Sequence, residues 1–254
     1  MTLVLAFLAA AALAPPLTRT LAASRLARPN HRGARIGSPL GLLILAAATP
    51  VLSLTPFAAF ALGVAALGFI DDLYGRAVHG VRAHLAALRA RRPDTGALKA
   101  AGTLALATLT LRWQGLEGAR LVLGIGVLVL AAHAFNLLDV RPGRAIKAFV
   151  LLAGALLATA STIRPLHAIG PFIGPIAVVA VYDLRERGML GDCGASLLGA
   201  LAGLLLVMTL PTAGLAIALA ALAATAIYGE LRSISALIAG VPLLRCLDSV
   251  GRPA

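Results

Sequence analysis

Charged residues are scarce in this sequence and make up only 13% of its 254 positions. Soluble domains carry about a quarter charged residues, so a soluble fold of this chain would have to bury nearly every side chain. Hydrophobic residues instead make up 60% of the chain, and its mean hydropathy is +0.94. Apolar runs of about 16 to 20 residues recur along the whole length, and each is long enough to cross the hydrocarbon core of a bilayer. The composition therefore predicts an all-α polytopic membrane protein.

Cysteine and aromatic residues are also rare. The two cysteines, Cys193 and Cys246, are far apart in the sequence and indicate no disulfide framework. Aromatic residues account for 4% of the chain, and they are not interleaved with basic residues as in nucleic-acid-binding motifs. The net charge of +12 is therefore no sign of a nucleic-acid partner. A secretory signal alone does not explain the first apolar segment, because comparable segments follow it to the end of the chain.

Nine apolar segments predict about nine transmembrane helices, which places the two termini on opposite sides of the membrane. The segments are residues 2–18, 38–53, 55–72, 97–112, 118–138, 147–163, 166–182, 194–210 and 212–229. All lysines and arginines except Arg112, Arg120 and Arg164 fall on the side that carries the C-terminus. By the positive-inside rule, the N-terminus is outside and the C-terminus is cytosolic, in what we expect to be a prokaryotic plasma membrane. Anionic lipid of the inner leaflet then accounts for most of the net charge.

The chain divides into two regions on this pattern. Residues 1–229 are expected to form a transmembrane catalytic bundle with cytosolic loops, and residues 230–254 a cytosolic tail. Apolar residues of the tail are spaced among Arg245, Asp248 and Arg252, as in an amphipathic helix that lies in the membrane interface. A packed lid under the bundle is the alternative.

The acidic residues are distributed unevenly as well, because every Asp and Glu except Glu117 falls on the predicted cytosolic side. The most notable are Asp71 and Asp72, which follow the apolar segment 56–70 and precede a basic loop. A charge at the bilayer centre costs roughly 2.5–3.5 kcal/mol, so the pair is expected at the membrane–water boundary or in a wet cavity. Adjacent acids also repel each other and favour a cation, a proton or a basic partner nearby. A helix-end pair that only marks the interface is the alternative.

Two further segments place oxygen-bearing side chains on the same side. Asn136 and Asp139 are three residues apart and project to one side of a continuing helix. Asp192 lies between Gly191 and Gly194, where the backbone can approach an ion or a bulky anion closely, and the following helix start offers free amides to phosphate. The alternatives are a capped helix end with basic interface anchors for the first segment, and a simple helix-start acid stabilised by the dipole for the second.

Together these segments indicate hard-cation chemistry. The carboxylates and the amide supply oxygen ligands, which suit Mg²⁺, or Mn²⁺ as the alternative ion, rather than zinc. Mg²⁺ often takes one or two protein oxygens and completes its shell with phosphate and water. A basic, carboxylate-bearing cleft at the membrane surface therefore favours a diphosphate substrate together with a lipid phosphate.

At these residues the chain resembles the polyprenyl-phosphate N-acetylhexosamine-1-phosphate transferase superfamily, glycosyltransferase family 4. The family includes phospho-N-acetylmuramoyl-pentapeptide transferase and the undecaprenyl-phosphate N-acetylglucosamine-1-phosphate transferases. The resemblance covers nearly the whole chain in order. It rests on residues 29–33 through Gly41, the aspartate-pair motif at 68–74, a loop lysine at Lys99, the asparagine-rich motif at 133–139 and the glycine-aspartate motif at 190–194.

The resemblance implies a Mg²⁺-dependent enzyme of cell-envelope biogenesis that transfers a sugar-1-phosphate from a UDP-sugar to a polyprenyl phosphate. Asp192 and Asn136 would hold the Mg²⁺ that bridges the donor diphosphate, and Asp71 and Asp72 would engage or deprotonate the lipid phosphate. Lys99 would neutralise substrate charge. The remaining implied residues are Asp139 in catalysis, and Asn30 and His133 in substrate binding. A homodimer is expected on the same likeness.

The sequence departs from the family pattern at several points. Pro142 occupies the position of a second aspartate in the asparagine-rich motif, and His133 stands where asparagine is typical. No histidine follows His167, so the histidine-rich loop of the family is absent, and one of the ten usual helices is missing. The candidates to replace that loop in binding the diphosphate are arginines, which contact phosphate bidentately: Arg141, Arg144, Arg185 and Arg187. Ordinary positive-inside anchoring is the alternative for these four.

Two other function classes follow from the same residues. A catalytically inactive relative would bind a polyprenyl phosphate or a membrane partner without turnover, as the missing loop allows. A secondary transporter is less favoured, because transporters place ionisable residues near the bilayer midplane, whereas here they gather on one face.

Overall fold

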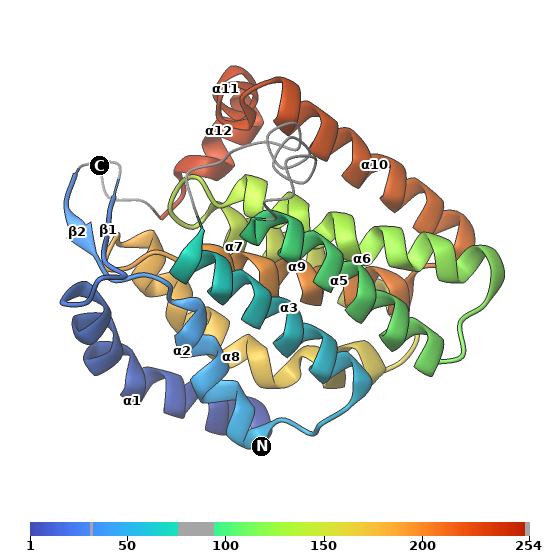
Figure 1. The fold of residues 1–254 in the computed structure, drawn as a ribbon, viewed down its shortest axis with the longest axis horizontal. Coiled ribbons are helices and arrows are strands. Elements are labelled where there is room, and N and C mark those ends of the chain that lie inside the picture. Colours follow the sequence, from blue (N-terminus) through green and yellow to red (C-terminus); the bar gives the residue numbers. More distant parts are fainter. Residues whose placement is uncertain (31–32, 76–93, 252–254) are drawn as a thin grey trace.

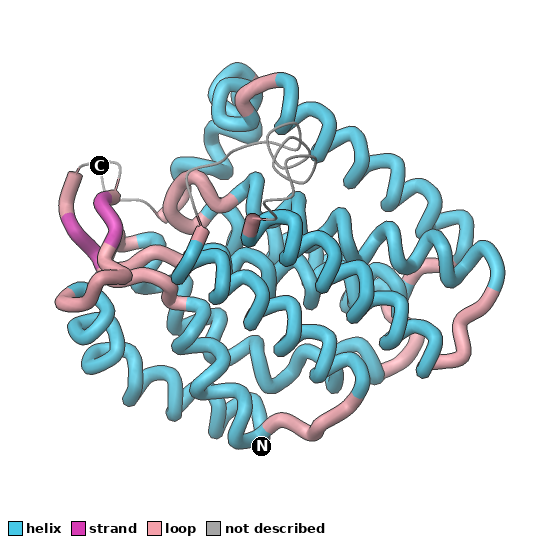
Figure 2. The backbone as a smooth tube through the Cα atoms, viewed as in Figure 1, coloured by secondary structure: helices cyan, strands magenta, loops and turns pink. Residues whose placement is uncertain are grey.

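The computed structural model describes residues 1–30, 33–75 and 94–251. Three parts of the chain lie outside the described residues: His31 and Arg32 in the segment 29–33, the basic loop at 76–93, and the last three residues of the tail. Within the described part the chain is helical, apart from one short hairpin and the connecting loops (Figure 2). The helices are α1 (Thr2–Ala22), α2 (Gly41–Ala48), α3 (Pro56–Tyr74), α5 (Thr95–Trp113), α6 (Gly118–Leu138), α7 (Arg144–Thr159), α8 (Arg164–Leu184), α9 (Gly191–Thr209), α10 (Thr212–Leu231), α11 (Ile234–Gly240) and α12 (Pro242–Ser249).

Six helices are long and apolar enough to cross a membrane, namely α1, α3, α6, α8, α9 and α10. This finding confirms the predicted class of an all-α chain with membrane-spanning character. Each of the nine predicted segments overlaps a helix, but the number of crossings and the orientation of the termini stay predictions. The second segment is shorter than expected: α2 ends at Ala48 and continues as a 3-10 turn, η1 (Thr49–Val51). Pro50 explains the change, because proline has no N–H to continue an α-helix.

Helix α9 is the centre of the bundle. It packs against α3 and α6 with large contacts and against α7 with a smaller one (Figure 1), and most of its residues are buried. Glycines allow the close approach: a Cβ at Gly68 of α3 would collide with the Asp192 carbonyl, and one at Gly41 of α2 would collide with the backbone of Gly194. Small residues at helix contacts let backbones approach each other in this way. The start of α9 is thereby fixed against α2 and α3.

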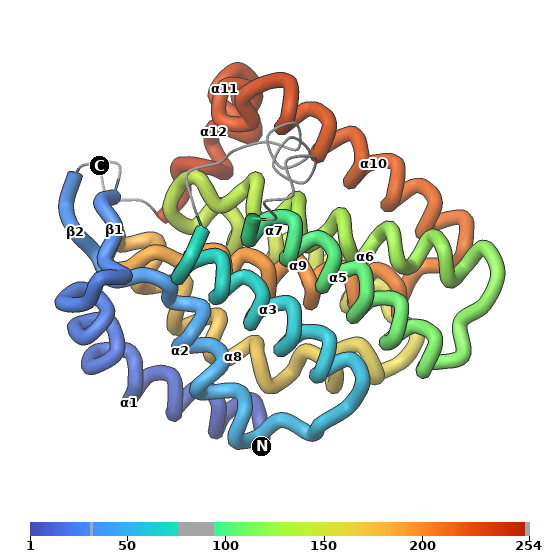
Figure 3. The backbone as a smooth tube through the Cα atoms, viewed as in Figure 1, coloured from blue at the N-terminus to red at the C-terminus, as the bar shows by residue number. Residues whose placement is uncertain are grey.

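Several connections gather at one end of the bundle, which we call the carboxylate end. The last turn of α3, the first turns of α5 and α9, and the turn after α6 lie there, with the hairpin of β1 (Arg28–Pro29) and β2 (Arg35–Ile36) beside them (Figure 3). β1 and β2 are antiparallel, with Arg28 opposite Ile36. The segment after β2 follows the loop after α8, because the Met189 amide donates to the Gly37 carbonyl and the Leu40 amide to the Met189 carbonyl.

The C-terminal tail also lies toward the carboxylate end, as Figure 1 shows. It forms two short helices, α11 and α12, rather than the one amphipathic helix suggested by its apolar spacing. Gly240 and Pro242 account for the break, because glycine is a weak helix former and proline ends one helix and begins the next.

Candidate functional site

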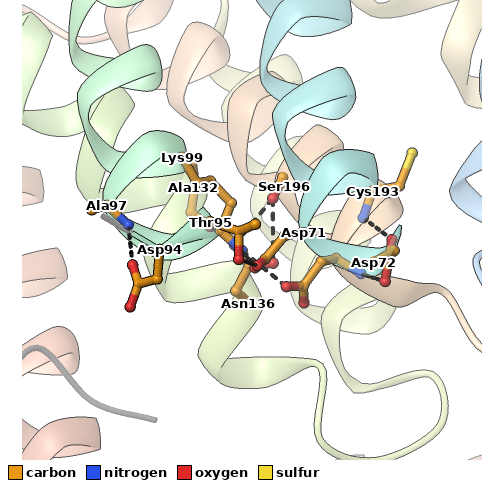
Figure 4. Close-up of polar contacts among 11 residues, drawn as sticks. Asp71, Asp72, Asp94, Thr95, Ala97, Lys99, Ala132, Asn136, Cys193 and Ser196 are labelled. Atoms are coloured by element: carbon orange, nitrogen blue, oxygen red, sulfur yellow. Dashed lines mark hydrogen bonds and ion pairs between the residues drawn. The ribbon is translucent and has the colours of Figure 1, made fainter. Parts of the chain in front are cut away.

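Three charged side chains from three helices meet at the carboxylate end, and Figure 4 labels two of them, Asp71 and Lys99. The Lys99 ammonium in the first turns of α5 lies 2.8 Å from Asp71 Oδ2 and 2.9 Å from Asp192 Oδ2. The Thr95 hydroxyl donates to the other oxygen of Asp71. Asp71 lies in the last turn of α3 and Asp192 in the first turn of α9, so one lysine joins two carboxylates that are far apart in the sequence. These residues were predicted to come together, and the structure brings them together.

The second aspartate of the pair has a different environment. Asp72 Oδ1 accepts from the backbone amide of Asp192 at 3.0 Å, and Oδ2 accepts from the amide of Cys193 at 2.8 Å. The first amides of a helix lack partners within it, and the helix dipole favours a negative charge there. Asp72 therefore caps α9 and fixes the position of Asp192, and Figure 4 shows its contact with the Cys193 amide. The Arg28 guanidinium donates to the Asp72 carbonyl at 3.1 Å and adds positive charge nearby.

Asn136 joins the group from the last turn of α6. Its amide nitrogen donates to the Ala132 carbonyl at 3.0 Å and to Ser196 Oγ at 3.1 Å. Ser196 lies one helical turn after Asp192, so both point from the same side of α9. The Asn136 side chain is thereby held beside the first turn of α9, as Figure 4 shows.

A second pair of acids lies behind this cluster. Asp183, at the end of α8, is buried and accepts from the Gly143 amide at 2.6 Å. Gly143 has a φ of 71°, which glycine adopts without strain, and this turns the chain from α6 into α7. Burial and, to a lesser degree, the neighbouring Asp183 carboxylate raise the pKa of Asp139 well above its usual range. The protonated, neutral form of Asp139 is therefore favoured more than it is for a carboxyl group in water.

A small pocket opens beside the two acids, between the hairpin, the turn after α6 and the loop after α8. It is lined by Asn30, Ile36, Asp139, Val140, Arg141, Pro142, Asp183, Met189 and Leu190. Asn30 is held in place, because its Oδ1 accepts from the Ala34 amide at 2.9 Å and its Nδ2 donates to Glu186 Oε2 at 2.9 Å. The pocket thus places an amide, two carboxyl groups and an arginine around one opening.

The remaining predicted site residues lie in three different settings. Arg141 is exposed and lines the pocket, whereas Arg185 and Arg187 are exposed just after α8. His133 is partly buried one turn before Asn136. Arg144 is apart from the cluster: its guanidinium pairs with Asp248 of α12 and donates to Ser235.

Sequence reasoning missed the hydroxyl groups of the site. Thr95 bonds Asp71, and Ser196 bonds Asn136. Ser196 could have been found from its spacing, because it is four residues after Asp192 and so on the same helix face. Thr95 gave no such signal, since its partner is on another helix.

The chain matches no protein-family model and no curated protein in the comparisons made with known proteins. The function is therefore argued from the geometry of the site.

The oxygens of the site suit a hard cation. Two carboxylate oxygens, one from Asp71 and one from Asp192, already converge on a single cationic nitrogen. Among the residues that the structure describes, no three His, Cys, Asp or Glu side chains form a complete metal cage. Mg²⁺ does not need one, since one or two carboxylates with phosphate and water suffice. The donor set therefore suits Mg²⁺, which Asp192 and Asn136 would hold.

Proposed function

We propose that this protein is a Mg²⁺-dependent phosphoglycosyltransferase, which moves a sugar-1-phosphate from a UDP-sugar onto a polyprenyl phosphate. The carboxylate end would face the cytosol of a prokaryotic cell, with the chain crossing the plasma membrane about nine times. The supporting observation is the meeting of Asp71, Lys99, Asp192 and Asn136 at one end of an apolar helix bundle. A membrane-embedded chain has few reasons to gather such groups except to handle a charged substrate.

The excess of acidic over basic side chains in the cluster supports the binding of Mg²⁺ there. Asp71, Asp72 and Asp192 carry three carboxylates against the ammonium of Lys99 and the nearby guanidinium of Arg28. The Asp192 side chain is still 40% exposed, so one carboxylate of the cluster remains open to a ligand. When bound, Mg²⁺ would neutralise the donor diphosphate and hold it against the protein oxygens.

The reaction exchanges one phosphoanhydride for another. An oxygen of the lipid phosphate attacks the phosphorus that carries the sugar, and a new P–O bond forms. The bond from that phosphorus to the bridging oxygen breaks, and the nucleoside monophosphate leaves with the bonding electrons. A lipid phosphate is already anionic near neutral pH, so the step needs no strong base. Catalysis of this kind depends on positioning and charge neutralisation.

The protein groups divide between these two tasks. Lys99 is held between Asp71 and Asp192, where its ammonium can offset charge on the transferring phosphoryl group. Asp71, bonded by Thr95 and Lys99, orients that ammonium. Asp72 holds α9, and with it Asp192, through two backbone amides. The pocket beside Asp139, with Asn30 and the exposed Arg141 at its edge, is the adjoining place for the nucleotide-sugar.

The decisive experiment is a transfer assay on the purified full chain. The protein is incubated with undecaprenyl phosphate, Mg²⁺ and a panel of UDP-sugars, and lipid products are resolved by mass. A sugar-diphosphate lipid that disappears on addition of a chelator is expected. Absence of any product with every donor, alongside an active transferase as control, would contradict the proposal.

One observation favours a second candidate, a relative that binds polyprenyl phosphate or a membrane partner without turnover. Both oxygens of Asp71 and both oxygens of Asp72 already have partners within the protein, as in a purely structural ion-pair network. This candidate predicts lipid binding without transfer, and unchanged function in cells after Asp192→Ala. Loss of function in cells that carry the Asp192→Ala variant would exclude this candidate.

A further inference from the structure

One face of α12 is fixed to the bundle by a bidentate ion pair. Asp248 Oδ1 lies 2.9 Å from Arg144 Nε, and Oδ2 lies 3.1 Å from Nη2. The third nitrogen of Arg144 donates to Ser235 Oγ of α11 at 3.0 Å. Both charged side chains are nearly buried, at 5% and 10% exposed. Bidentate pairs of this kind fix orientation as well as distance.

Lys147, one turn further along α7, fixes the end of the same helix. Its ammonium donates to the carbonyls of Leu247 at 2.9 Å, Asp248 at 2.6 Å and Val250 at 3.2 Å. Basic groups commonly satisfy the last carbonyls of a helix. With the side chain of Asp248 and the carbonyls at its end both held, α12 cannot rotate about its axis. We call these contacts the tail clamp.

The face of α12 opposite Asp248 is apolar. At about 100° per residue, Leu243, Cys246, Leu247 and Val250 fall on one side of the helix and Asp248 on the other. Leu243 is 69% exposed, Leu247 40% and Val250 58%. Cys246 is exposed as well. The clamp therefore holds the apolar face away from the protein, the reverse of the arrangement expected for a lid in water.

The surroundings of this face identify what covers it. α12 follows α10 through the short α11, and α10 is a span of which only 11% is buried inside the protein. Most of the apolar surface of that span is therefore exposed, and the tail follows it directly in the chain. Arg232 and Arg245, both exposed, add the positive charge that attracts anionic headgroups. We infer that α12 lies in the membrane interface, with Leu243, Cys246, Leu247 and Val250 against the lipid of the inner leaflet.

A second copy of the chain is a poorer occupant. Stable protein interfaces bury about 1,000 Å² or more, and one face of an eight-residue helix cannot supply that area. An interfacial helix has no such threshold, because its binding increases with the apolar area that enters the headgroup region and with the charge beside it. This inference concerns the tail alone, so it does not depend on the proposed transferase activity.

Cys246 allows a direct test, because it is on the apolar face while Cys193 is buried. The full chain with Cys193→Ala is labelled at Cys246 with an environment-sensitive fluorophore. It is reconstituted in vesicles of equal amounts of phosphatidylcholine and phosphatidylglycerol. The matched control carries Cys193→Ala, Cys246→Ser and Arg245→Cys, which moves the label by one residue to the polar side. Quenching by spin-labelled lipid is compared with quenching by aqueous iodide, and the unfolding temperature of both variants is measured to show that they fold alike.

The label at position 246 is expected to be quenched several-fold more by the lipid quencher than the label at position 245, and less by iodide. Equal iodide quenching at the two positions would overturn the inference, because the helix would then be in water. Protection of position 246 from both quenchers would also overturn it, in favour of a protein partner or a second copy. In Arg144→Gln the difference between the positions should shrink. An unchanged difference in that variant would overturn the role of the ion pair in orienting α12.

Discussion

Two ion-pair clusters lie toward the same end of this molecule and differ in charge balance. In the cluster of Asp71, Asp72 and Asp192, one lysine serves two of three carboxylates, and Asp192 is 40% exposed. In the tail clamp, two bases, Arg144 and Lys147, serve the one carboxylate of Asp248 and the carbonyls beside it, and Arg144 and Asp248 are nearly buried. This closed cluster has no carboxylate to spare and is equipped to hold two elements together. The unbalanced, open cluster has carboxylate to spare for a ligand, which is the main reason to place the chemistry there.

The two clusters also differ in the basic residue that pairs with the carboxylate. Arginine binds a carboxylate through a planar fork, so its pair with Asp248 is directional and difficult to displace. Lysine is a point charge on a flexible stem, and Lys99 can move between Asp71, Asp192 and a substrate phosphate without losing its charge partners. Variants that remove these charges test whether the first cluster binds a ligand and the tail clamp only holds the tail.

The largest effect is expected for Asp192→Asn. The change removes the open carboxylate of the cluster while it preserves the side-chain shape. Transfer to polyprenyl phosphate should fall by more than about a hundredfold, since even outer partners of metal ligands cost 10–100-fold. The initial rate of lipid product at saturating donor measures it. Asp248→Asn makes the same chemical change in the tail clamp and should leave transfer within a few-fold of the wild type. Equal rates for Asp192→Asn and the wild type would show that the open carboxylate has no part in the reaction.

Arg144→Gln tests the closed cluster. It leaves the nearly buried Asp248 without its guanidinium, and loss of one partner of a buried pair costs about 3 kcal/mol. Because the pair joins the tail to α7, we expect local release of α11 and α12 rather than unfolding of the bundle. Trypsin should then cut after Arg232 and Arg245 much faster, as followed by mass. Arg141→Gln, an exposed arginine on the same turn, is the control and should not change the cleavage rate. Unchanged cleavage in Arg144→Gln would mean that other contacts hold the tail.

A smaller effect is expected for Lys99→Met, which leaves Asp71 and Asp192 facing each other without a cation. The free energy of unfolding should fall by about 2 kcal/mol. This is less than for a closed ion pair, because the site is partly open to water. Mg²⁺ can take over the missing charge, so it should raise the unfolding temperature of this variant more than that of the wild type. Lys147→Met, in the tail clamp, should show no such dependence on Mg²⁺. If the ion stabilises both variants equally, the cluster does not bind it.

The fold was predictable from composition and apolar spacing because a bilayer imposes length and polarity on every span. Helix ends were predictable only in part. α2 ends early, at Ala48, where η1 with Pro50 follows, and the tail divides at Gly240 and Pro242. At both places local backbone chemistry overrides an apolar pattern. The number of crossings depends on how the shorter helices sit in lipid, which neither apolar spacing nor helix length decides.

The site was predictable to the level of which residues meet. Asp71, Lys99, Asn136 and Asp192 were expected together and lie together, because all four are near helix ends at the same end of the bundle. Their individual partners were not predictable. Asp72 was expected to engage the lipid phosphate, but its oxygens bond the amides of α9, a contact set by the close approach of α3 and α9 at Gly68. Arg144 was a candidate for the diphosphate, and the tail, which is distant in sequence, pairs with it instead.

Asp72→Asn is expected to have the smallest effect. An asparagine can accept one of the two amides through its oxygen, but it turns its NH₂ toward the other, and it loses the charge that the helix dipole favours. Loss of a cap costs typically about 1 kcal/mol, and the dipole adds a few tenths to 1 kcal/mol. Since Asp72 acts through the position of Asp192, transfer should fall by about tenfold, as 1.4 kcal/mol is a factor of ten. More Mg²⁺ should be needed, with an unchanged pH profile.

The matched control is Asp94→Asn at the start of α5, where Oδ1 accepts from the Ala97 amide at 2.8 Å. Asparagine caps a single amide as well as aspartate does, so this variant should have nearly wild-type transfer and Mg²⁺ dependence. A general base lost from the site would behave differently from either. Removal of a general base typically lowers the reaction rate 10²–10⁴-fold, and one of the two slopes of the rate-against-pH curve disappears. Such a result for Asp72→Asn would mean that the carboxylate leaves α9 during the reaction to take a proton, and that the open cluster uses its capping acid as well as Asp192.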